Sequence, residues 1–204
     1  MKKVFLFLTV MAAMTALNAF APPAGYQVGD KAKDFKLKNV DGKMVSLADY
    51  KSAKGFIVVF TCNHCPYAKL YESRIIDLDK KYAAKGYPVI AINPNDPSIE
   101  AEDSFDNMVQ RAKEKSYPFP YLFDQTQEYA QAYGAVRTPH VFVLNKKGSD
   151  LIVEYIGAID DNTEVPTAVK TKYVENAVNE LLAGKKVTTT STKAVGCGIK
   201  WKKA

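Results

Sequence analysis

The chain has 204 residues and a formal net charge of +6, with three cysteines and two histidines. The excess charge is at the ends, because residues 20–182 hold 20 basic and 22 acidic side chains, whereas residues 183–204 hold six lysines and no acid. A near-neutral body without an aromatic–basic platform argues against nucleic-acid binding. Three cysteines are also too few for a small fold held together by disulfides, so the fold must rest on its core.

The first 19 residues predict a secretory signal peptide. Two lysines follow Met1, an apolar run extends from Val4 to about Leu17, and the small residues Ala19 and Ala21 offer cleavage positions. This run is too short to span a membrane comfortably. We therefore expect cleavage after Ala19 and a periplasmic or secreted protein, with an uncleaved N-terminal anchor as the alternative.

Residues 26–184 alternate between strand and helix patterns and predict a single domain. The runs at 56–60 and 88–93 are apolar at every or nearly every position, which predicts central strands buried on both faces. In chain order we expect a hairpin of strands at 35–38 and 44–47, a strand at 56–60, a helix from 66 that stops at Gly86, a strand at 88–93, a helix at 105–115, a strand at 121–123, a helix at 125–133, antiparallel strands at 141–144 and 151–156, and a helix at 169–182.

Two cysteines stand two residues apart where the strand at 56–60 leads into the first helix. A helix N-terminus stabilises a thiolate, and two thiols at this spacing form and break a disulfide with little chain movement. We expect Cys62 to be the exposed attacking thiol and largely ionised, and Cys65 to be the buried resolving thiol. His64 between them would stabilise the Cys62 thiolate. An inert disulfide or half of a metal site is the alternative.

A second motif supports the redox interpretation. Thr138 and Pro139 stand at the entry to the strand at 141–144, and this pair resembles the cis-proline loop that faces the active cysteines of thioredoxin-like proteins. Residues 29–35 resemble the G-x-x-A-P-D-F opening of redoxins related to AhpC/TSA. The sequences C-N-H-C-P at 62–66 and G-C-G-I-K-W at 196–201 resemble a narrower set of bacterial thioredoxin-family proteins. The order of the elements, together with this resemblance, implies an α/β thioredoxin-like fold with an N-terminal β-hairpin and a central insertion around residues 94–120.

The expected function is exported thiol–disulfide exchange through Cys62 and Cys65, with no cofactor and no metal. The partners implied are protein or small-molecule thiols and disulfides, and a redox partner that recycles the pair. A peroxidase of the AhpC/TSA type is one alternative. Peroxiredoxins, however, carry threonine three residues and proline seven residues before the peroxidatic cysteine, where this chain has Val59 and Gly55 if Cys62 is that cysteine. A zinc or copper chaperone is a second possibility, and a redox-inactive interaction module is a third.

The basic tail, residues 185–204, contains the third cysteine, Cys197. A solvated tail has no need of Ile199 and Trp201, so we expect this segment to fold back and bury Trp201. If it docks near the start of the first helix, Cys197 joins the pair in a three-thiol relay. The alternative is a free or intermolecular cysteine. The second histidine, His140, follows Pro139 and is a further candidate beside the redox loop.

Overall fold

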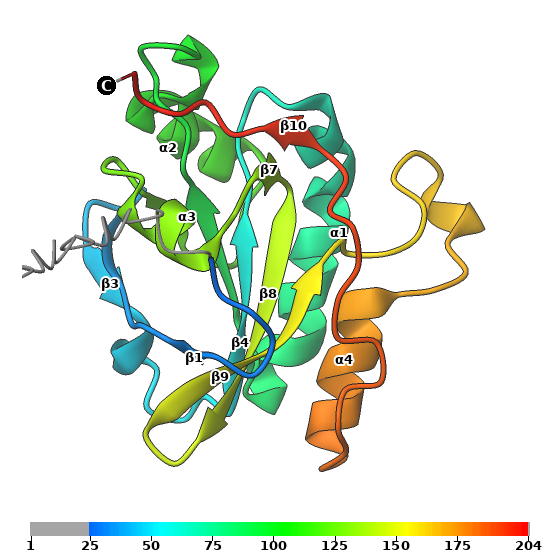
Figure 1. Ribbon diagram of the computed structural model, residues 1–204. Helices are drawn as coiled ribbons and strands as arrows, with labels where there is room; N and C mark the ends of the chain where they lie inside the picture. Colours follow the sequence, from blue (N-terminus) through cyan, green and yellow to red (C-terminus); the bar gives the residue numbers. More distant parts are fainter. Residues whose placement is uncertain (1–24, 204) are drawn as a thin grey trace, which may run out of the picture.

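The computed structural model describes residues 25–203, so the predicted signal peptide at residues 1–19 lies outside the described residues. An eight-stranded sheet, ordered β1-β9-β8-β4-β5-β6-β2-β3, forms its centre (Figure 1). The strands are β1 (Lys31–Ala32), β2 (Lys36–Asn39), β3 (Met44–Ser46), β4 (Gly55–Phe60), β5 (Val89–Asn93), β6 (Tyr121–Phe123), β7 (Arg137–Thr138), β8 (His140–Lys147), β9 (Asp150–Gly157) and β10 (Cys197–Gly198). The helices are α1 (Pro66–Tyr82), α2 (Phe105–Glu114), α3 (Glu128–Tyr133) and α4 (Tyr173–Leu182).

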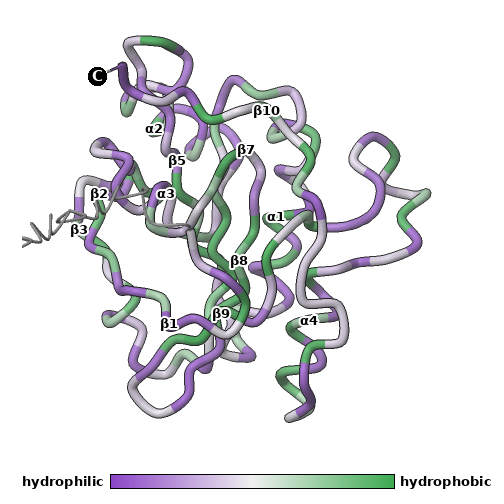
Figure 2. The backbone as a smooth tube through the Cα atoms, viewed as in Figure 1, coloured by the Kyte–Doolittle hydropathy of each residue, from purple (hydrophilic) through white to green (hydrophobic). Residues whose placement is uncertain are grey.

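The central strand β4 separates two hydrophobic clusters. It runs parallel to β5 and antiparallel to β8, and all six of its residues are buried. Successive side chains point to opposite faces of a strand, and accordingly Ile57 and Val59 join one cluster while Phe56, Val58 and Phe60 join the other. The expected two-sided burial is therefore confirmed, and Figure 2 shows hydrophobic residues concentrated along the central strands.

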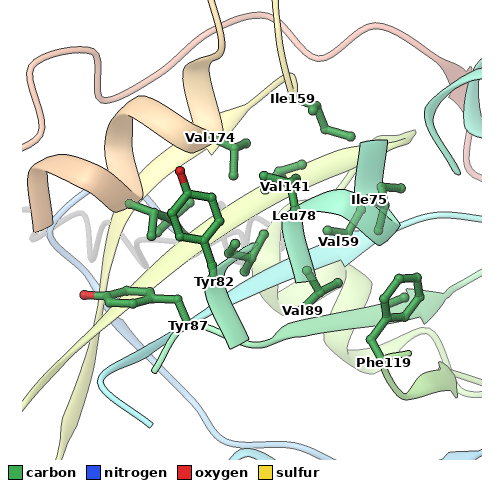
Figure 3. Close-up of a cluster of buried hydrophobic side chains, with 14 of the residues drawn as sticks. Val59, Ile75, Leu78, Tyr82, Tyr87, Val89, Phe119, Val141, Ile159 and Val174 are labelled. Atoms are coloured by element: carbon green, nitrogen blue, oxygen red, sulfur yellow. The ribbon is translucent and has the colours of Figure 1, made fainter. Parts of the chain in front are cut away.

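Three helices cover one face of the sheet. Tyr82 of α1, Met108 of α2 and Val174 of α4 belong to the same buried cluster, part of which is drawn in Figure 3. Ala130 and Tyr133 of α3 pack in the cluster on the opposite face. The expected order of strands and helices is confirmed, as are the hairpin of β2 with β3 and the antiparallel pair of β8 with β9.

Two helices begin later than the sequence predicts. The predicted start of α3 at residue 125 is wrong because Gln127 has a left-handed backbone with φ 62°, which interrupts the helical path before Glu128. The predicted start of α4 at residue 169 is also wrong. A 3-10 turn at Pro166–Ala168 ends in an extended Val169, and α4 begins only at Tyr173.

The C-terminal segment folds back over the domain, as expected. Ser191 forms a bridge with Ile156, and β10 pairs antiparallel with β7 at the end of the sheet where α1 begins (Figure 1). The expected burial of Trp201 is only partial, whereas Ile199 is 7% exposed, so Ile199 is the main apolar anchor of the segment. Among residues 25–203, no helix combines the length and the apolar character needed to cross a membrane.

Candidate active site

The two thiols of the C-x-x-C motif lie at the junction of β4 and α1. The backbone N–H of Thr61 donates to the carbonyl of Ile92 at 2.8 Å, which fixes the chain after β4. Cys65 is the N-cap of α1, and Pro66 takes the first helical position, where its missing N–H costs least. The junction therefore places the Cys65 sulfur at the positive end of the helix dipole.

Both thiols are buried, and this corrects the expectation of an exposed Cys62. Cys62 is 5% exposed and Cys65 is fully buried. The cause is the loop before β8, because the hydroxyl of Thr138 lies 3.1 Å from the Cys62 sulfur. The Cys65 thiol donates to the carbonyl of Thr138 at 3.2 Å. The Thr138–Pro139 peptide bond is cis, so the pair forms the expected loop, and its threonine contacts both sulfurs.

The two thiols share their proton unequally. The hydrogen bond with Cys65 raises the pKa of the Cys62 thiol, burial and the Asp103 carboxylate raise it further, and the Thr138 hydroxyl opposes them. The pKa of Cys65 is lowered, first by the hydrogen bond with Cys62, and also by hydrogen bonds with Cys197 and the backbone of Ala68. Burial and the Asp103 carboxylate thus oppose ionisation of Cys62 in the reduced pair, contrary to the expectation of an ionised Cys62 thiol.

A buried carboxylate, which no motif in the sequence indicates, organises the C-x-x-C turn from the central insertion. Asp103 is fully buried, and its Oδ1 accepts from the backbone N–H groups of Asn63 at 2.6 Å and His64 at 3.2 Å. Its Oδ2 lies 2.6 Å from Nδ1 of His64 and accepts from the Asn95 side chain at 2.7 Å. Asp103 therefore holds both the backbone of the Cys62–Cys65 turn and the imidazole between the cysteines.

The imidazole of His64 contacts Asp103 and Cys62 through one and the same nitrogen. The same atom, Nδ1, is 2.6 Å from Asp103 and 3.5 Å from the Cys62 sulfur. A proton on Nδ1 that is donated to an ionised Asp103 leaves that nitrogen without a lone pair for the thiol. His64 thus contacts Cys62, as expected, but its orientation is set by Asp103.

His140 lies beside the site without a hydrogen-bond partner on Nδ1 within residues 25–203. Its ring lies tilted against Phe142, with the ring centroids 4.7 Å apart, and burial lowers the pKa of this histidine to about 4. Within residues 25–203, one group of side chains could hold a metal. It consists of Cys62, His64 and Asp103, and one ligating atom from each lies within 4.8 Å of the others. Thiolate, imidazole and carboxylate together suit zinc, although an ion would have to displace the His64–Asp103 hydrogen bond.

Cys197 lies beside the pair. It is partly exposed, it stands opposite Thr138 in the β7–β10 register, and it packs against Cys62, Cys65 and Ala68. All three cysteines are free thiols in this structure. The fold therefore brings together every residue that the sequence predicts for the site: Cys62, His64, Cys65, Thr138, Pro139 and Cys197.

The comparisons with known proteins agree with this fold. The model of the AhpC/TSA family matches residues 28–154. The thiol-disulfide oxidoreductase ResA of Geobacillus thermodenitrificans is 26% identical over 131 residues, which cover 64% of this chain and 71% of that protein. A crystal structure of an uncharacterized conserved protein from Geobacillus kaustophilus is 39% identical, with a TM-score of 0.80, and the match covers 87% of this chain and 94% of that one.

A more distant structure supports the fold alone. The putative thiol:disulfide interchange protein DsbE from Chlorobium tepidum has a TM-score of 0.52 and 24% identity, with 62% of this chain and 84% of that chain covered. The fold and the paired thiols define a thioredoxin-like oxidoreductase. Because the family model spans more than half of its length, the chain belongs to the AhpC/TSA family.

Proposed function

We propose that the protein exchanges disulfides with thiol-containing substrates through Cys62 and Cys65. The observation that supports this function is the contact of both sulfurs with one residue, Thr138, at the N-terminus of α1. Cys62 is the attacking thiol because it is the more accessible of the two, and Cys65, which is fully buried, is the resolving thiol. Pro139 positions Thr138, and His64, held by Asp103, orients the turn.

The exchange begins at Cys62. This thiol gives up its proton to water and attacks the substrate disulfide as a thiolate. A mixed disulfide forms between Cys62 and one substrate sulfur, and the other substrate sulfur leaves as a thiolate. This leaving thiolate takes the proton from the Cys65 thiol. The Cys65 thiolate then attacks the Cys62 sulfur, which releases the second substrate thiolate and forms the Cys62–Cys65 disulfide.

Two variants test these roles. Cys62→Ser in a Cys197→Ser background should abolish the reduction of insulin or of a model disulfide, because the one remaining thiol, Cys65, is fully buried. Cys65→Ser should accumulate a mixed disulfide on Cys62, which mass spectrometry detects as an adduct of the substrate mass. Thr163→Ser, a conservative change distant from the thiols in the loop that contacts Arg74, serves as the matched hydroxyl control. Full activity in Cys62→Ser contradicts the assignment.

The proposal includes export. The basic start and the short apolar run of residues 1–19 support secretion to the periplasm or beyond. Such compartments favour disulfides, so a recycling redox partner is required there. N-terminal sequencing of the protein recovered from the extracytoplasmic fraction should give a chain that begins after Ala19. Recovery of the intact chain from the cytosol contradicts this part of the proposal.

A further inference from the structure

We infer that Cys197 is a third redox thiol, which attacks the Cys65 sulfur of the oxidised pair, forms a Cys65–Cys197 disulfide and releases Cys62 as a thiol. This inference rests on the proposed function, which supplies the Cys62–Cys65 disulfide. The structure also indicates which of the two sulfurs in that disulfide Cys197 attacks. Cys197 packs against the pair and stands opposite Thr138 in the β7–β10 register. The backbone carbonyl of Thr138 accepts from Cys65, whereas Cys62 contacts only its side-chain hydroxyl, so Cys65 is the sulfur bound to the backbone that pairs with Cys197.

The position of Cys197 is fixed by contacts on both sides. Upstream, the Arg137 guanidinium donates to the carbonyl of Gly196 at 2.9 Å. Downstream, the backbone N–H of Lys200 donates to the Asn95 side chain at 2.9 Å, and the carbonyl of Lys200 accepts from the backbone N–H of Asp96 at 3.0 Å. The Gln127 side chain also donates to that carbonyl at 2.8 Å. A thiol held in this way beside a disulfide has a high effective concentration for exchange.

The charges around Cys197 change in the required direction when the pair is oxidised. In the reduced protein, burial raises the pKa of Cys197, and its hydrogen bond to Cys65 and the charge on Cys65 raise it further, against the effect of Lys200 and Arg137. A Cys62–Cys65 disulfide carries no charge, so both contributions from Cys65 disappear. Lys200 and Arg137 remain, which favours the Cys197 thiolate when a disulfide is available to attack.

The exchange conserves electrons and atoms. The Cys197 thiolate forms a bond to the Cys65 sulfur, the Cys62–Cys65 bond breaks, and Cys62 leaves as a thiolate. Cys197 is the most exposed of the three thiols, because Cys62 is 5% exposed and Cys65 is fully buried. An external dithiol reductant therefore meets Cys197 first. It forms a mixed disulfide with Cys197, releases Cys65 as a thiolate, and its second thiol then frees Cys197 as the reductant is oxidised.

Two neighbouring glycines provide a matched test. A Cβ added at Gly196 would overlap the carbonyl of Thr138, which is backbone that cannot move aside cheaply, whereas a Cβ added at Gly198 meets no atom within 4 Å. Gly196→Ala therefore displaces Cys197 while all three cysteines stay in the chain, and because the same carbonyl accepts from Cys65, the yield of the Cys62–Cys65 disulfide is measured in the same digest. Gly198→Ala adds the same methyl group on the other side of Cys197 and leaves the β7–β10 pairing in place. Circular dichroism establishes that both variants are folded.

The experiment maps disulfides after the reduced protein reacts with oxidised glutathione and is quenched with acid. Wild type and Gly198→Ala should yield both Cys62–Cys65 and Cys65–Cys197 linked peptides, and Gly196→Ala should lose at least nine-tenths of the second. Cys62→Ser should still form the Cys65–Cys197 disulfide, which keeps the test decisive if Gly196→Ala fails to fold. A Cys197 that stays fully alkylatable in wild type and in Cys62→Ser overturns the inference. The absence of a Cys62–Cys65 disulfide in wild type overturns the proposed function instead.

Discussion

The buried carboxylate of Asp103 should slow the reaction of Cys62, because its charge is one of the causes that raise the pKa of that thiol, and Asp103→Asn isolates this effect. One ligating atom of each residue lies within 4.8 Å of the other. Two unit charges at that separation repel each other by about 3 kcal/mol at an effective dielectric constant of about 20. Salt screens this repulsion little, because Asp103 is fully buried and Cys62 is 5% exposed. Removing the carboxylate charge should therefore lower the pKa of the Cys62 thiol.

The size of the expected change follows from two opposing effects. A free energy of about 3 kcal/mol corresponds to roughly a hundredfold increase in the thiolate fraction. A thiolate of lower pKa is a weaker nucleophile, which cancels about half of that gain on a logarithmic scale. Alkylation of Cys62 below its pKa should accelerate about tenfold.

The assay measures iodoacetamide alkylation against pH in a background that also carries Cys65→Ser and Cys197→Ser, so that Cys62 is the remaining thiol. Glu102→Gln is the matched control, because it removes the same charge from the adjacent, exposed residue, which pairs with Lys69 at 3.3 Å. Glu102→Gln should leave the profile unchanged. If Asp103→Asn leaves the profile unchanged or slows alkylation, the reasoning is refuted, and the carboxylate acts mainly by holding a charged imidazole.

Three further predictions concern other parts of the protein. Reaction with hydrogen peroxide, followed by stopped-flow fluorescence, should be far slower than in dedicated peroxidases, because Val59 and Gly55 are buried in β4 where a hydroxyl and a proline ring would be needed; a comparable rate contradicts this. Burial lowers the pKa of His140 to about 4, whereas the same histidine in the unfolded chain has a pKa near 6.5. As the pH falls, the unfolded state therefore binds a proton first, and the free energy of unfolding decreases between about pH 6.5 and pH 4. His140→Phe should remove roughly 2 kcal/mol of the loss between pH 6.5 and 5 in denaturant titrations, and an unchanged pH dependence rules this out. Asn95→Ala should cost about 1–3 kcal/mol, because it removes one hydrogen bond from the buried Asp103 carboxylate and leaves the N–H of Lys200 unpaired, and should speed alkylation of Cys197; equal rates in wild type and variant contradict this coupling.

The sequence predicts the sheet well because its strands and helices follow local periodicity. The run 56–60 is apolar throughout and becomes β4, buried on both faces. Gly86 stops the first helical stretch with φ 96°, a conformation that glycine adopts without strain. The late start of α3 was not predictable in the same way. Gln127 has a left-handed backbone, and its side chain donates to the carbonyl of Lys200, a contact between residues 73 positions apart that local periodicity does not show.

The site follows the same distinction between local and distant signals. The two cysteines and the Thr138–Pro139 pair are recognisable because each motif is compact. Asp103 was missed because it lies 39 residues from His64 and follows Glu100 and Glu102, in a run that resembles a solvated acidic surface. Its burial becomes evident only when the insertion folds over the turn between the cysteines.

Asn95 shows why the insertion and the tail have to be considered together. Its amide nitrogen donates to Asp103 at 2.7 Å, and its amide oxygen accepts from the backbone of Lys200 at 2.9 Å. One side chain thus connects the carboxylate that holds His64 with the segment that holds Cys197. Because a buried donor or acceptor left unpaired costs about 1–3 kcal/mol, movement of the tail away from the thiols also weakens the support of the Cys62–Cys65 turn. Access to the thiols and the geometry of the redox pair are therefore coupled through a residue that contacts neither sulfur by hydrogen bond.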